Sequence, residues 1–177
     1  TTHKNITVMP SNANLAGAEV ELTTVHGREF ALKELLNGIL ADYIIIDCPP
    51  SLGLLTINAL CSADKVLIPV QTEYYALEGI TQLLQIVQKV QKSANPKLSI
   101  LGVLLTMYDQ RTTLSKQVQD ELSNHFGDLL FKTVIPRNIR LAEAPSHGIP
   151  ISEYDKWSKG ARSYKALSKE VMNRTGV

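Results

Sequence analysis

An aspartate that follows a run of apolar residues is the sharpest chemical feature of this sequence. Asp47 comes directly after the apolar residues 43–46. This is the Walker B pattern, in which such an aspartate helps to hold Mg²⁺ beside a nucleotide phosphate. An aspartate at the end of a strand also commonly caps the next turn or helix. The pattern therefore leaves a metal role and a structural role open for Asp47.

Arg111 and Arg140 each follow the end of a predicted strand. Ligands of open parallel sheets bind at the carboxyl ends of the strands, and a basic edge there would contact phosphates without reading sequence. The alternative is that Arg111 pairs with Asp109 and Arg140 with Glu143, as exposed ion pairs of little energetic weight. The polar segments expected at this edge, besides Asp47, are 71–73, 106–111 and 136–140.

Other chemistries find little support in the sequence. It contains no GxGxxG dinucleotide fingerprint and no GxSxG nucleophile elbow. The four histidines are scattered, and Cys48 and Cys61 stand at neither zinc-ligand nor cluster spacing. We expect both cysteines to be reduced and buried, which fits a cytosolic compartment.

Apolar runs alternate with amphipathic patterns along the whole chain. This rhythm predicts a single domain, or part of one, over 1–177, with a three-layer α/β/α architecture and a mostly parallel sheet. Continuous apolar runs are typical of parallel strands that are buried on both faces. The predicted strands are 5–9, 43–46, 65–70, 99–106 and 130–135, and the predicted helices are 30–40, 54–62, 77–90, 114–126 and 161–171.

Composition places the chain among ordinary globular domains. It has 177 residues, 44% of them apolar and 20% charged, with a net charge of +1. Residues 1–96 carry a net charge of −3 and residues 97–177 one of +4, so a polyanion-binding face would belong to the second part. No apolar run is long enough to span a bilayer. The first residue is not Met, so we expect the sequence to begin inside a longer protein.

Several ordered segments resemble the ParA/Soj family of ATPases, which partition bacterial chromosomes and plasmids. The string DCPPSLGLLT over 47–56 is similar to the family's Walker B segment, and IPRNIRLAEAPSHG over 135–148 is the most specific match. The resemblance covers nearly the whole chain and corresponds to the C-terminal two thirds of a family member. Further similar segments are 11–22, 71–79 and 105–112.

The resemblance implies a P-loop NTPase-like fold and a set of functional residues. Asp47 would be the Walker B carboxylate, which orients Mg²⁺ mainly through water. Two arginines through which family members bind DNA without sequence preference align with Arg111 and Arg140. Lys116, Lys132, Lys156, Lys159 and Arg162 would extend this basic surface. The residues expected to contact the adenine base are Thr106, Met107, Pro136, Arg137 and Asn138.

The sequence departs from the family at the phosphate site. It contains neither a GxxxxGK[ST] loop nor the variant KGGVGKT, and it lacks the upstream aspartate that assists attack by water. Without the loop's N–H groups and lysine, little stabilises a transferring phosphoryl group. We therefore expect no catalytic residue and no ATP hydrolysis in this chain alone. In the family the P-loop strand lies between the strands that match 43–46 and 65–70. We therefore expect a gap in the sheet of this chain. The unpaired backbone groups at that gap should cause aggregation or be satisfied by a strand from another chain.

The resemblance further implies ATP and Mg²⁺ as cofactors of the full-length protein, an ATP-bound homodimer, and a cytoplasmic, nucleoid-associated location. Expected partners are non-specific DNA and a ParB-type centromere-binding protein that stimulates hydrolysis. Two alternatives stay open: a non-enzymatic fragment or adaptor that binds DNA or a partner, and a MinD-like membrane-associated regulator. The polar tail 168–177 disfavours membrane attachment. The sequence leaves the roles of Glu73, Tyr74 and Tyr75 open.

Overall fold

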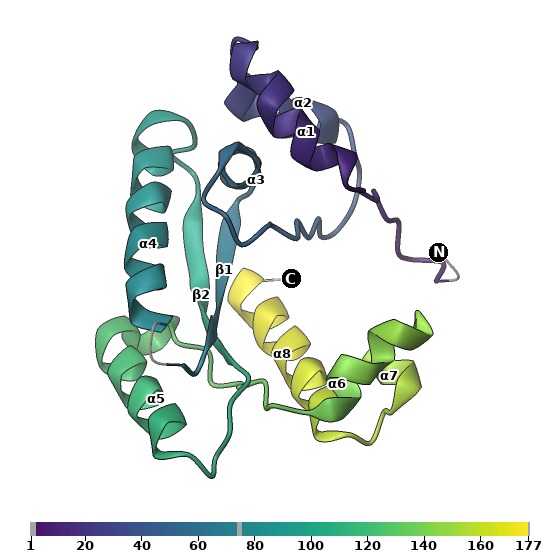
Figure 1. Cartoon of the computed structure of the whole chain (residues 1–177), viewed down its shortest axis with the longest axis vertical. Coiled ribbons are helices and arrows are strands. Elements are labelled where there is room, and N and C mark those ends of the chain that lie inside the picture. The colour runs from purple at the N-terminus through teal and green to yellow at the C-terminus, as the bar shows by residue number, and fades with distance from the viewer. Residues whose placement is uncertain (1–2, 74–75, 177) are drawn as a thin grey trace.

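The computed structural model describes residues 3–73 and 76–176 (Figure 1). Two strands and eight α-helices are assigned in these residues, with four short 3-10 turns between them. The strands are β1 (Lys65–Gln71) and β2 (Ser99–Thr106). The helices are α1 (Asn14–Glu21), α2 (Ala31–Leu36), α3 (Leu54–Ser62), α4 (Ala76–Ser93), α5 (Thr113–Phe126), α6 (Ile139–Glu143), α7 (Ile151–Tyr154) and α8 (Lys159–Thr175). The 3-10 turns are Leu22–Thr24, Arg28–Phe30, Gly127–Leu129 and Ala144–His147.

The sheet is parallel, as the alternating pattern predicts. β1 pairs with β2 from Lys65 opposite Ser99 to Gln71 opposite Thr106, with one irregularity between Val66 and Leu67. Helix α4 makes the crossover between the two strands, which is the connection that a parallel pair requires.

The predicted strand 130–135 is only partly formed. The N–H groups of Phe131 and Ile135 donate to the carbonyls of Val103 and Leu105 at 2.8 and 2.9 Å, but these contacts form only isolated bridges and no continuous strand. The N–H groups of Lys132 and Thr133 donate instead to the carboxylate of Glu170 in α8, both at 2.9 Å. The prediction of a continuous strand is therefore wrong, because a side chain of α8 takes up the backbone donors in its middle.

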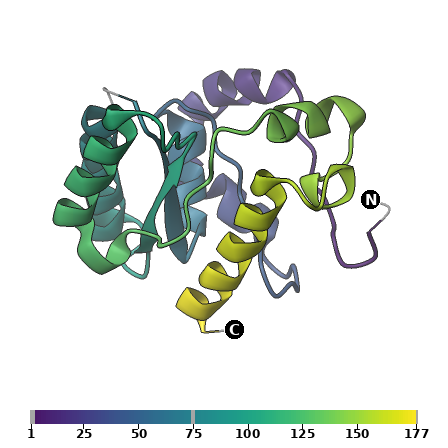
Figure 2. The ribbon, with the colours of Figure 1, turned by 90° about the horizontal axis from the view of Figure 1, so that it is seen from below.

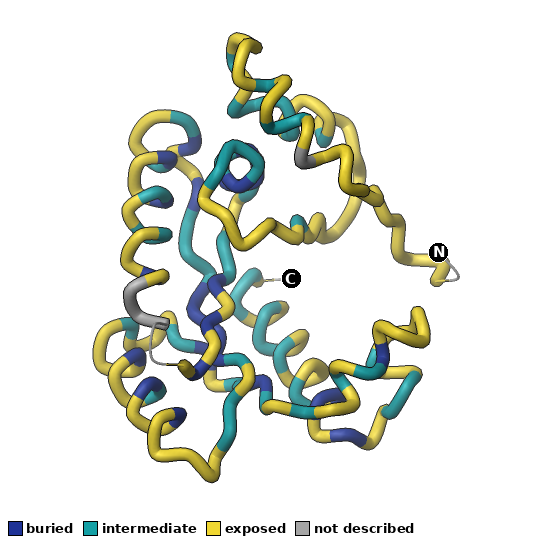
Figure 3. Tube along the Cα trace, in the orientation of Figure 1, coloured by how far each residue is buried: buried dark blue, intermediate teal, exposed yellow. Residues whose placement is uncertain are grey.

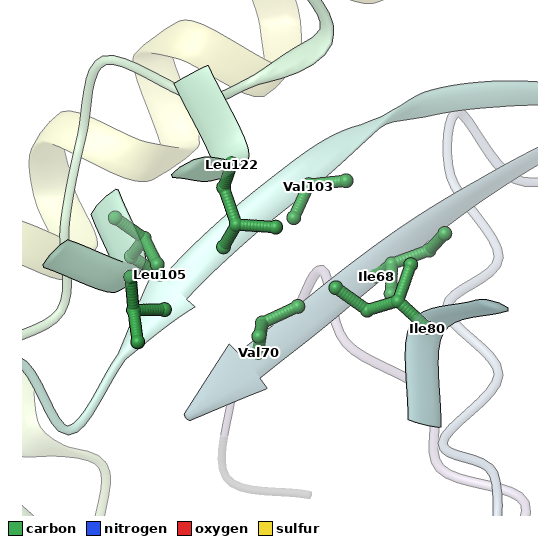
Figure 4. Packing of buried hydrophobic residues seen from close by; sticks show 7 residues of the cluster. Ile68, Val70, Ile80, Val103, Leu105 and Leu122 are labelled. Carbon is green, nitrogen blue, oxygen red and sulfur yellow. The ribbon is translucent and has the colours of Figure 1, made fainter. Parts of the chain in front are cut away.

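Helices cover both faces of the sheet. Alternate residues of the strands point to opposite faces, so Val103 and Leu105 pack against α4 and α5, whereas Leu104 packs against Phe131 and α8. Figure 2 shows α4 and α5 on one side of the strands and α8 on the other. Figure 4 shows the first of these layers, with the labelled side chains of Ile68, Val70, Ile80, Val103, Leu105 and Leu122.

Side-chain caps begin three of the helices. Thr112, Asn138 and Ser158 precede α5, α6 and α8, and each accepts a hydrogen bond from a backbone N–H of the first turn. Helix α8 ends at Gly176, which adopts the left-handed conformation that closes many helices. These local signals explain why the predicted helices 114–126 and 161–171 are found within a few residues of their expected bounds.

The N-terminal part of the chain differs most from its prediction. Residues 5–9 and 43–46 form no strand, and Ile45 is 91% exposed. Cys48 is exposed as well, whereas Cys61 is buried in α3 as expected. Figure 3 shows that exposed residues dominate the trace before α3. The strand predictions here are wrong because β1 pairs with β2 alone, so no backbone partner for 43–46 is present in the described sheet.

Among the helices of the described residues, none combines the length and the apolar character that crossing a membrane requires.

Candidate functional site

The loops that follow β1, β2 and the segment 130–135 meet at one edge of the sheet. The N–H of Thr72 donates to the carbonyl of Thr106 at 3.2 Å. The N–H of Tyr108 donates to Ile135 at 3.0 Å, and the N–H of Arg137 donates back to Tyr108 at 3.0 Å. The predicted convergence of 71–73, 106–111 and 136–140 is therefore confirmed.

Met107, directly after β2, has an unusual backbone conformation. Its φ is 54°, and it is the one non-glycine residue with positive φ in the described chain. Left-handed conformations are costly for residues with a Cβ and are found mainly where surrounding contacts impose them. A hydrogen bond of 3.3 Å from the hydroxyl of Thr72 to the carbonyl of Met107 is one such contact.

Two buried hydroxyls connect this turn to α5. The hydroxyl of Ser115 donates to that of Thr72 at 3.1 Å and accepts from the N–H of Asp109 at 3.3 Å. Both side chains are shielded from water, with Thr72 5% and Ser115 3% exposed. Because buried polar groups are costly without partners, this chain of hydrogen bonds holds the ends of β1 and β2 against the start of α5.

Asp109 holds Arg111 in a two-point ion pair. The Nε and Nη2 atoms of Arg111 donate to the two carboxylate oxygens at 2.9 and 2.7 Å, and the backbone N–H of Arg111 adds a third bond at 3.0 Å. Hydrogen bonds from Arg111 hold the pKa of Asp109 well below its usual range. The side chain of Arg111 is nevertheless 87% exposed, so its outer face is accessible to a phosphate.

Arg140 is paired as well, but less tightly. Its Nη1 donates to Glu143 Oε2 at 2.9 Å, and its Nε lies 3.6 Å from Asp155 Oδ2. The hydroxyl of Tyr154 donates to the same oxygen of Glu143 at 3.1 Å. The hydrogen bond to Glu143 raises the pKa of Arg140 above its ordinary value. Both pairings that the sequence left open are thus present, and both arginines still reach solvent.

The candidate base-contacting residues lie together at the same edge. Met107 and Pro136 leave apolar atoms partly exposed there, and the backbone bridge between Tyr108 and Pro136 holds their loops side by side. The Asn138 side chain caps α6 by accepting from the N–H of Arg140 at 3.0 Å. An apolar surface bordered by a few polar groups is the usual composition of a ligand site.

Glu73 and Arg137 join the loops after β1 and after 130–135. Arg137 Nη2 lies 3.6 Å from Glu73 Oε1, and both side chains are largely exposed. Glu73 therefore contributes to the sheet edge itself. Tyr74 and Tyr75, whose roles the sequence also left open, lie outside the described residues.

Asp47 lies apart from this edge. It is exposed in the irregular segment between α2 and α3, and the nearby Tyr43 hydroxyl is 2.8 Å from the hydroxyl of Thr175 at the carboxyl end of α8. The other end of α8 packs against α6, where a Cβ at Gly160 would come within 2.6 Å of Leu141. Figure 1 shows these two regions at opposite ends of α8. The structure brings Arg111 and Arg140 to one edge and leaves Asp47 elsewhere.

The described residues around Asp47 provide few other metal ligands. No group of three or more His, Cys, Asp or Glu residues that could hold a metal is present in 3–73 and 76–176. Mg²⁺ is often bound through one or two carboxylates, with water and substrate phosphates as its other ligands. Asp47 by itself could supply one such oxygen, but the described residues around it do not form a metal site.

The sequence analysis did not identify some of the residues at this sheet edge. Ser115 and Thr72 are 43 positions apart, and nothing in either local pattern indicates that their hydroxyls meet. The only available signal was the position of Ser115 three residues after Thr112, which is the spacing of a helix cap. Asp155, which faces Arg140 from another segment, was missed for the same reason, whereas Glu143 is three positions from Arg140 and its pairing was an open alternative in the sequence.

Comparison with known proteins agrees with this architecture. A family model described as an AAA domain matches residues 1–100. The Bacillus subtilis sporulation initiation inhibitor protein Soj is 58% identical over 173 residues, which cover 97% of this chain and 68% of Soj. The chromosome-partitioning ATPase Soj of Treponema pallidum is 51% identical, with 97% of this chain and 69% of that protein covered. The chain thus spans about two thirds of the length of these relatives.

Solved structures show the same fold. Cobyrinic acid a,c-diamide synthase from Mycobacterium smegmatis, with bound ADP and magnesium, superimposes with a TM-score of 0.76 at 37% identity. That match covers 94% of this chain and 62% of the synthase. The septum site-determining protein MinD from Pyrococcus horikoshii, complexed with Mg-ADP, gives a TM-score of 0.65 at 27% identity, with 84% and 57% of the two chains covered.

The parallel sheet and its helices therefore define an α/β protein of the P-loop NTPase class. Within that class, the chain belongs to the ParA/Soj family of chromosome-partitioning ATPases.

Proposed function

We propose that this chain is the DNA-binding part of a chromosome- or plasmid-partitioning ATPase. ATP-dependent dimerisation would control its attachment to non-specific DNA, and a ParB-type partner would stimulate hydrolysis. The observation that supports this best is that Arg111 follows β2 and Arg140 begins α6, directly after loops that backbone hydrogen bonds tie to one sheet edge. The Treponema pallidum relative is described as a chromosome-partitioning ATPase, which favours the same role here.

Pairing two such edges explains how a nucleotide could control DNA attachment. One edge offers two arginines, each already engaged by a carboxylate, so a single protomer would bind DNA weakly. Two protomers on one duplex would convert the second contact into an intramolecular one and raise the avidity steeply. Such a protein would be cytoplasmic and associated with the nucleoid.

The nucleotide would be ATP with Mg²⁺. The two solved structures named above hold ADP and magnesium, which supports an adenine nucleotide with this metal. Thr106, Met107, Pro136, Arg137 and Asn138 would contact the base. Asp47 lies apart from this edge here, so it would orient the metal through water only in a state in which 43–46 pairs with the sheet. The 177 residues contain no phosphate-binding glycine loop. We therefore propose that they hydrolyse no ATP above background when present alone.

Charge reversal of Arg140 tests the proposal. Arg140→Glu places a carboxylate beside Glu143 and Asp155, so it should abolish retention of a labelled random-sequence duplex in a low-salt anisotropy titration. Binding of a fluorescent ATP analogue should match that of the unmodified chain. Lys89→Glu, on the exposed side of α4, makes the same charge change and should leave DNA retention unchanged. DNA binding by Arg140→Glu equal to that of the unmodified chain would refute the assignment.

The nucleotide dependence separates the proposed function from its alternative. The measurement uses a longer form of the protein that carries the phosphate-binding loop, and DNA retention that rises with ATP and Mg²⁺ then supports a nucleotide-controlled protein. Retention that is the same with and without nucleotide would favour a DNA-binding adaptor without turnover.

A further inference from the structure

Carboxylates hold the two arginines of the sheet edge in different ways. Asp109 accepts from Nε and Nη2 of Arg111, which together form one edge of the planar guanidinium. Arg140, by comparison, gives its Nη1 to Glu143, while its Nε lies 3.6 Å from Asp155. Arg140 therefore has a carboxylate at both of its donor edges, whereas Arg111 has one at a single edge.

The second donor edge of Arg111 is free. It consists of Nη1 and the outer N–H of Nη2, and Nη1 makes no hydrogen bond within residues 3–73 and 76–176. A guanidinium carries five N–H donors in a rigid plane, and its pairs with phosphate are frequently bidentate. A phosphate can therefore bind the free edge of Arg111 while Asp109 keeps the other edge.

Asp109 is itself fixed by the start of α5. Its backbone N–H donates to the buried hydroxyl of Ser115 at 3.3 Å. Its carbonyl accepts from the N–H and from the hydroxyl of Thr112 at 3.1 and 3.0 Å. The side chain of Asp109 is only 20% exposed, against 87% for Arg111. A fixed, largely buried carboxylate thus holds an exposed cation.

We infer that Asp109 is a positioning residue for DNA binding, which holds Arg111 with the free edge of its guanidinium toward a phosphate. This inference rests on the proposed function. A long side chain that is mobile in the free protein loses its freedom on binding, and this lowers the affinity. Asp109 has already ordered Arg111 before DNA arrives. The carboxylates at Arg140 act in the opposite sense, because a phosphate must compete with them for the same donors.

Two opposing effects follow from neutralising Asp109. Removal of a negative charge near DNA favours binding, but the phosphate does not have to displace Asp109, and salt screens the remaining repulsion. Loss of the ordered arginine weakens binding by about two- to tenfold, the cost of ordering one long side chain at an interface. We therefore expect the loss to exceed the gain, so that removing this acid weakens DNA binding.

Asp109→Asn tests the sign of the effect. Asparagine keeps the shape of the side chain and one acceptor oxygen, but its amide nitrogen cannot accept from Nη2 of Arg111. We expect the affinity for a random-sequence duplex in a low-salt anisotropy titration to fall by about three- to fivefold. Asp120→Asn, on the exposed side of α5, removes the same charge and should change the affinity by less than about twofold.

A double variant shows whether the effect passes through Arg111. If Asp109 acts by positioning that side chain, Asp109→Asn should cause no further loss in an Arg111→Gln background, since coupled residues are not additive. An equal loss in both backgrounds would mean that Asp109 supports DNA binding by another route, which overturns the inference.

Asp109→Glu decides the matter if urea denaturation shows that Asp109→Asn is not folded. Glutamate keeps the charge, but its extra methylene group moves the carboxylate away from the backbone N–H of Arg111, which donates to Asp109 at 3.0 Å. We expect a similar loss of DNA affinity at unchanged net charge. Affinity equal to or above that of the unmodified chain in the folded variant that decides the test overturns the inference.

An Arg111→Gln/Arg140→Gln variant, measured in parallel, separates this inference from the proposed function. If that variant keeps its DNA binding, the proposed function and the inference both fail. If it loses DNA binding while a folded Asp109→Asn protein binds DNA as well as the unmodified chain or better, the proposed function stands. Asp109 is then a competitor of DNA, as we expect of Glu143, and the inference is wrong.

Discussion

The Nη1 atom of Arg140 donates to the Oε2 atom of Glu143 at 2.9 Å. An arginine that we propose as a DNA contact is thus engaged by an acid of its own helix. A phosphate must displace or share this partner, so Glu143 competes with DNA for the guanidinium.

Glu143→Gln should therefore strengthen DNA binding. The substitution removes the competing charge but keeps a side chain of the same size, and we expect a gain of about two- to fivefold in affinity, because exposed pairs are weak. Anisotropy titration at low salt measures it. Glu121→Gln, an equal change on the exposed side of α5, is the control. Weaker binding by Glu143→Gln would show that Glu143 positions Arg140 for DNA instead of competing with it.

Ser115→Ala should destabilise the fold. The substitution leaves the N–H of Asp109 without its acceptor and Thr72 without its donor, in a buried environment. We expect the free energy of unfolding to fall by about 1–3 kcal/mol, measured by urea denaturation. Ser168→Ala, on the exposed side of α8, should change it by less than about 0.5 kcal/mol. Equal effects of the two substitutions would mean that the buried hydroxyls contribute nothing specific.

Gly102→Ala should be among the most damaging single changes in β2. Gly102 has a φ of 154°, and an added Cβ would lie 2.4 Å from the carbonyl oxygen of Leu129 and 2.7 Å from the Phe131 ring. Since backbone atoms cannot give way cheaply, we expect a loss of more than about 2 kcal/mol in urea denaturation. Gly79→Ala is the control, because nothing lies near its added Cβ in α4 and alanine favours a helix. A Gly102→Ala protein as stable as the Gly79→Ala protein would contradict this.

Glu170 should make the stability of the α8 contact depend on pH. Burial raises the pKa of Glu170, but the N–H donors of Lys132 and Thr133 and the guanidinium of Arg174 outweigh it and hold the pKa below its ordinary value. A carboxyl with a lower pKa in the folded state stabilises the fold above its unfolded pKa of about 4.3. That contribution is lost as the pH falls through the lower, folded value.

Glu170→Gln should therefore lower the urea midpoint at pH 7 and show a smaller further loss between about pH 5 and 3 than the unmodified chain. Urea titrations across this range provide the measurement. Glu121→Gln serves again as the control and should keep the full acid dependence. Parallel pH profiles for Glu170→Gln and the unmodified chain would rule out this account.

The helices and strands with strong local signals were predictable. The long amphipathic patterns of α4, α5 and α8 and the apolar runs of β1 and β2 appear close to their expected bounds. The runs 5–9 and 43–46 have an equally strong β-type composition but form no strand. Composition measures only the tendency to lie in a buried sheet, and a strand also needs a neighbour for its backbone groups.

The meeting of the loops after β1, β2 and 130–135 at one edge of the sheet was predictable from the sequence. Parallel strands bring their carboxyl ends together, so the loops of Arg111 and Arg140 had to share an edge. The same rule placed Asp47 there, but it applies only to residues that follow a strand of the sheet. Because 43–46 is not paired with β1 in the described chain, Asp47 follows no strand, and Tyr43 of the same segment contacts the carboxyl end of α8.

By itself, the amino-acid sequence determined the class of fold, the order of its elements and the family, because periodicity, caps and ordered motifs are local properties of the chain. Only the tertiary structure decided which charges are neutralised and which are free. Glu73 meets Arg137, Asp155 meets Arg140, and Glu170 turns inward while the lysines of α8 face solvent. Charge pairing depends on distances of a few ångströms between side chains, and apart from contacts between near neighbours those distances exist only after the helices have packed on the sheet.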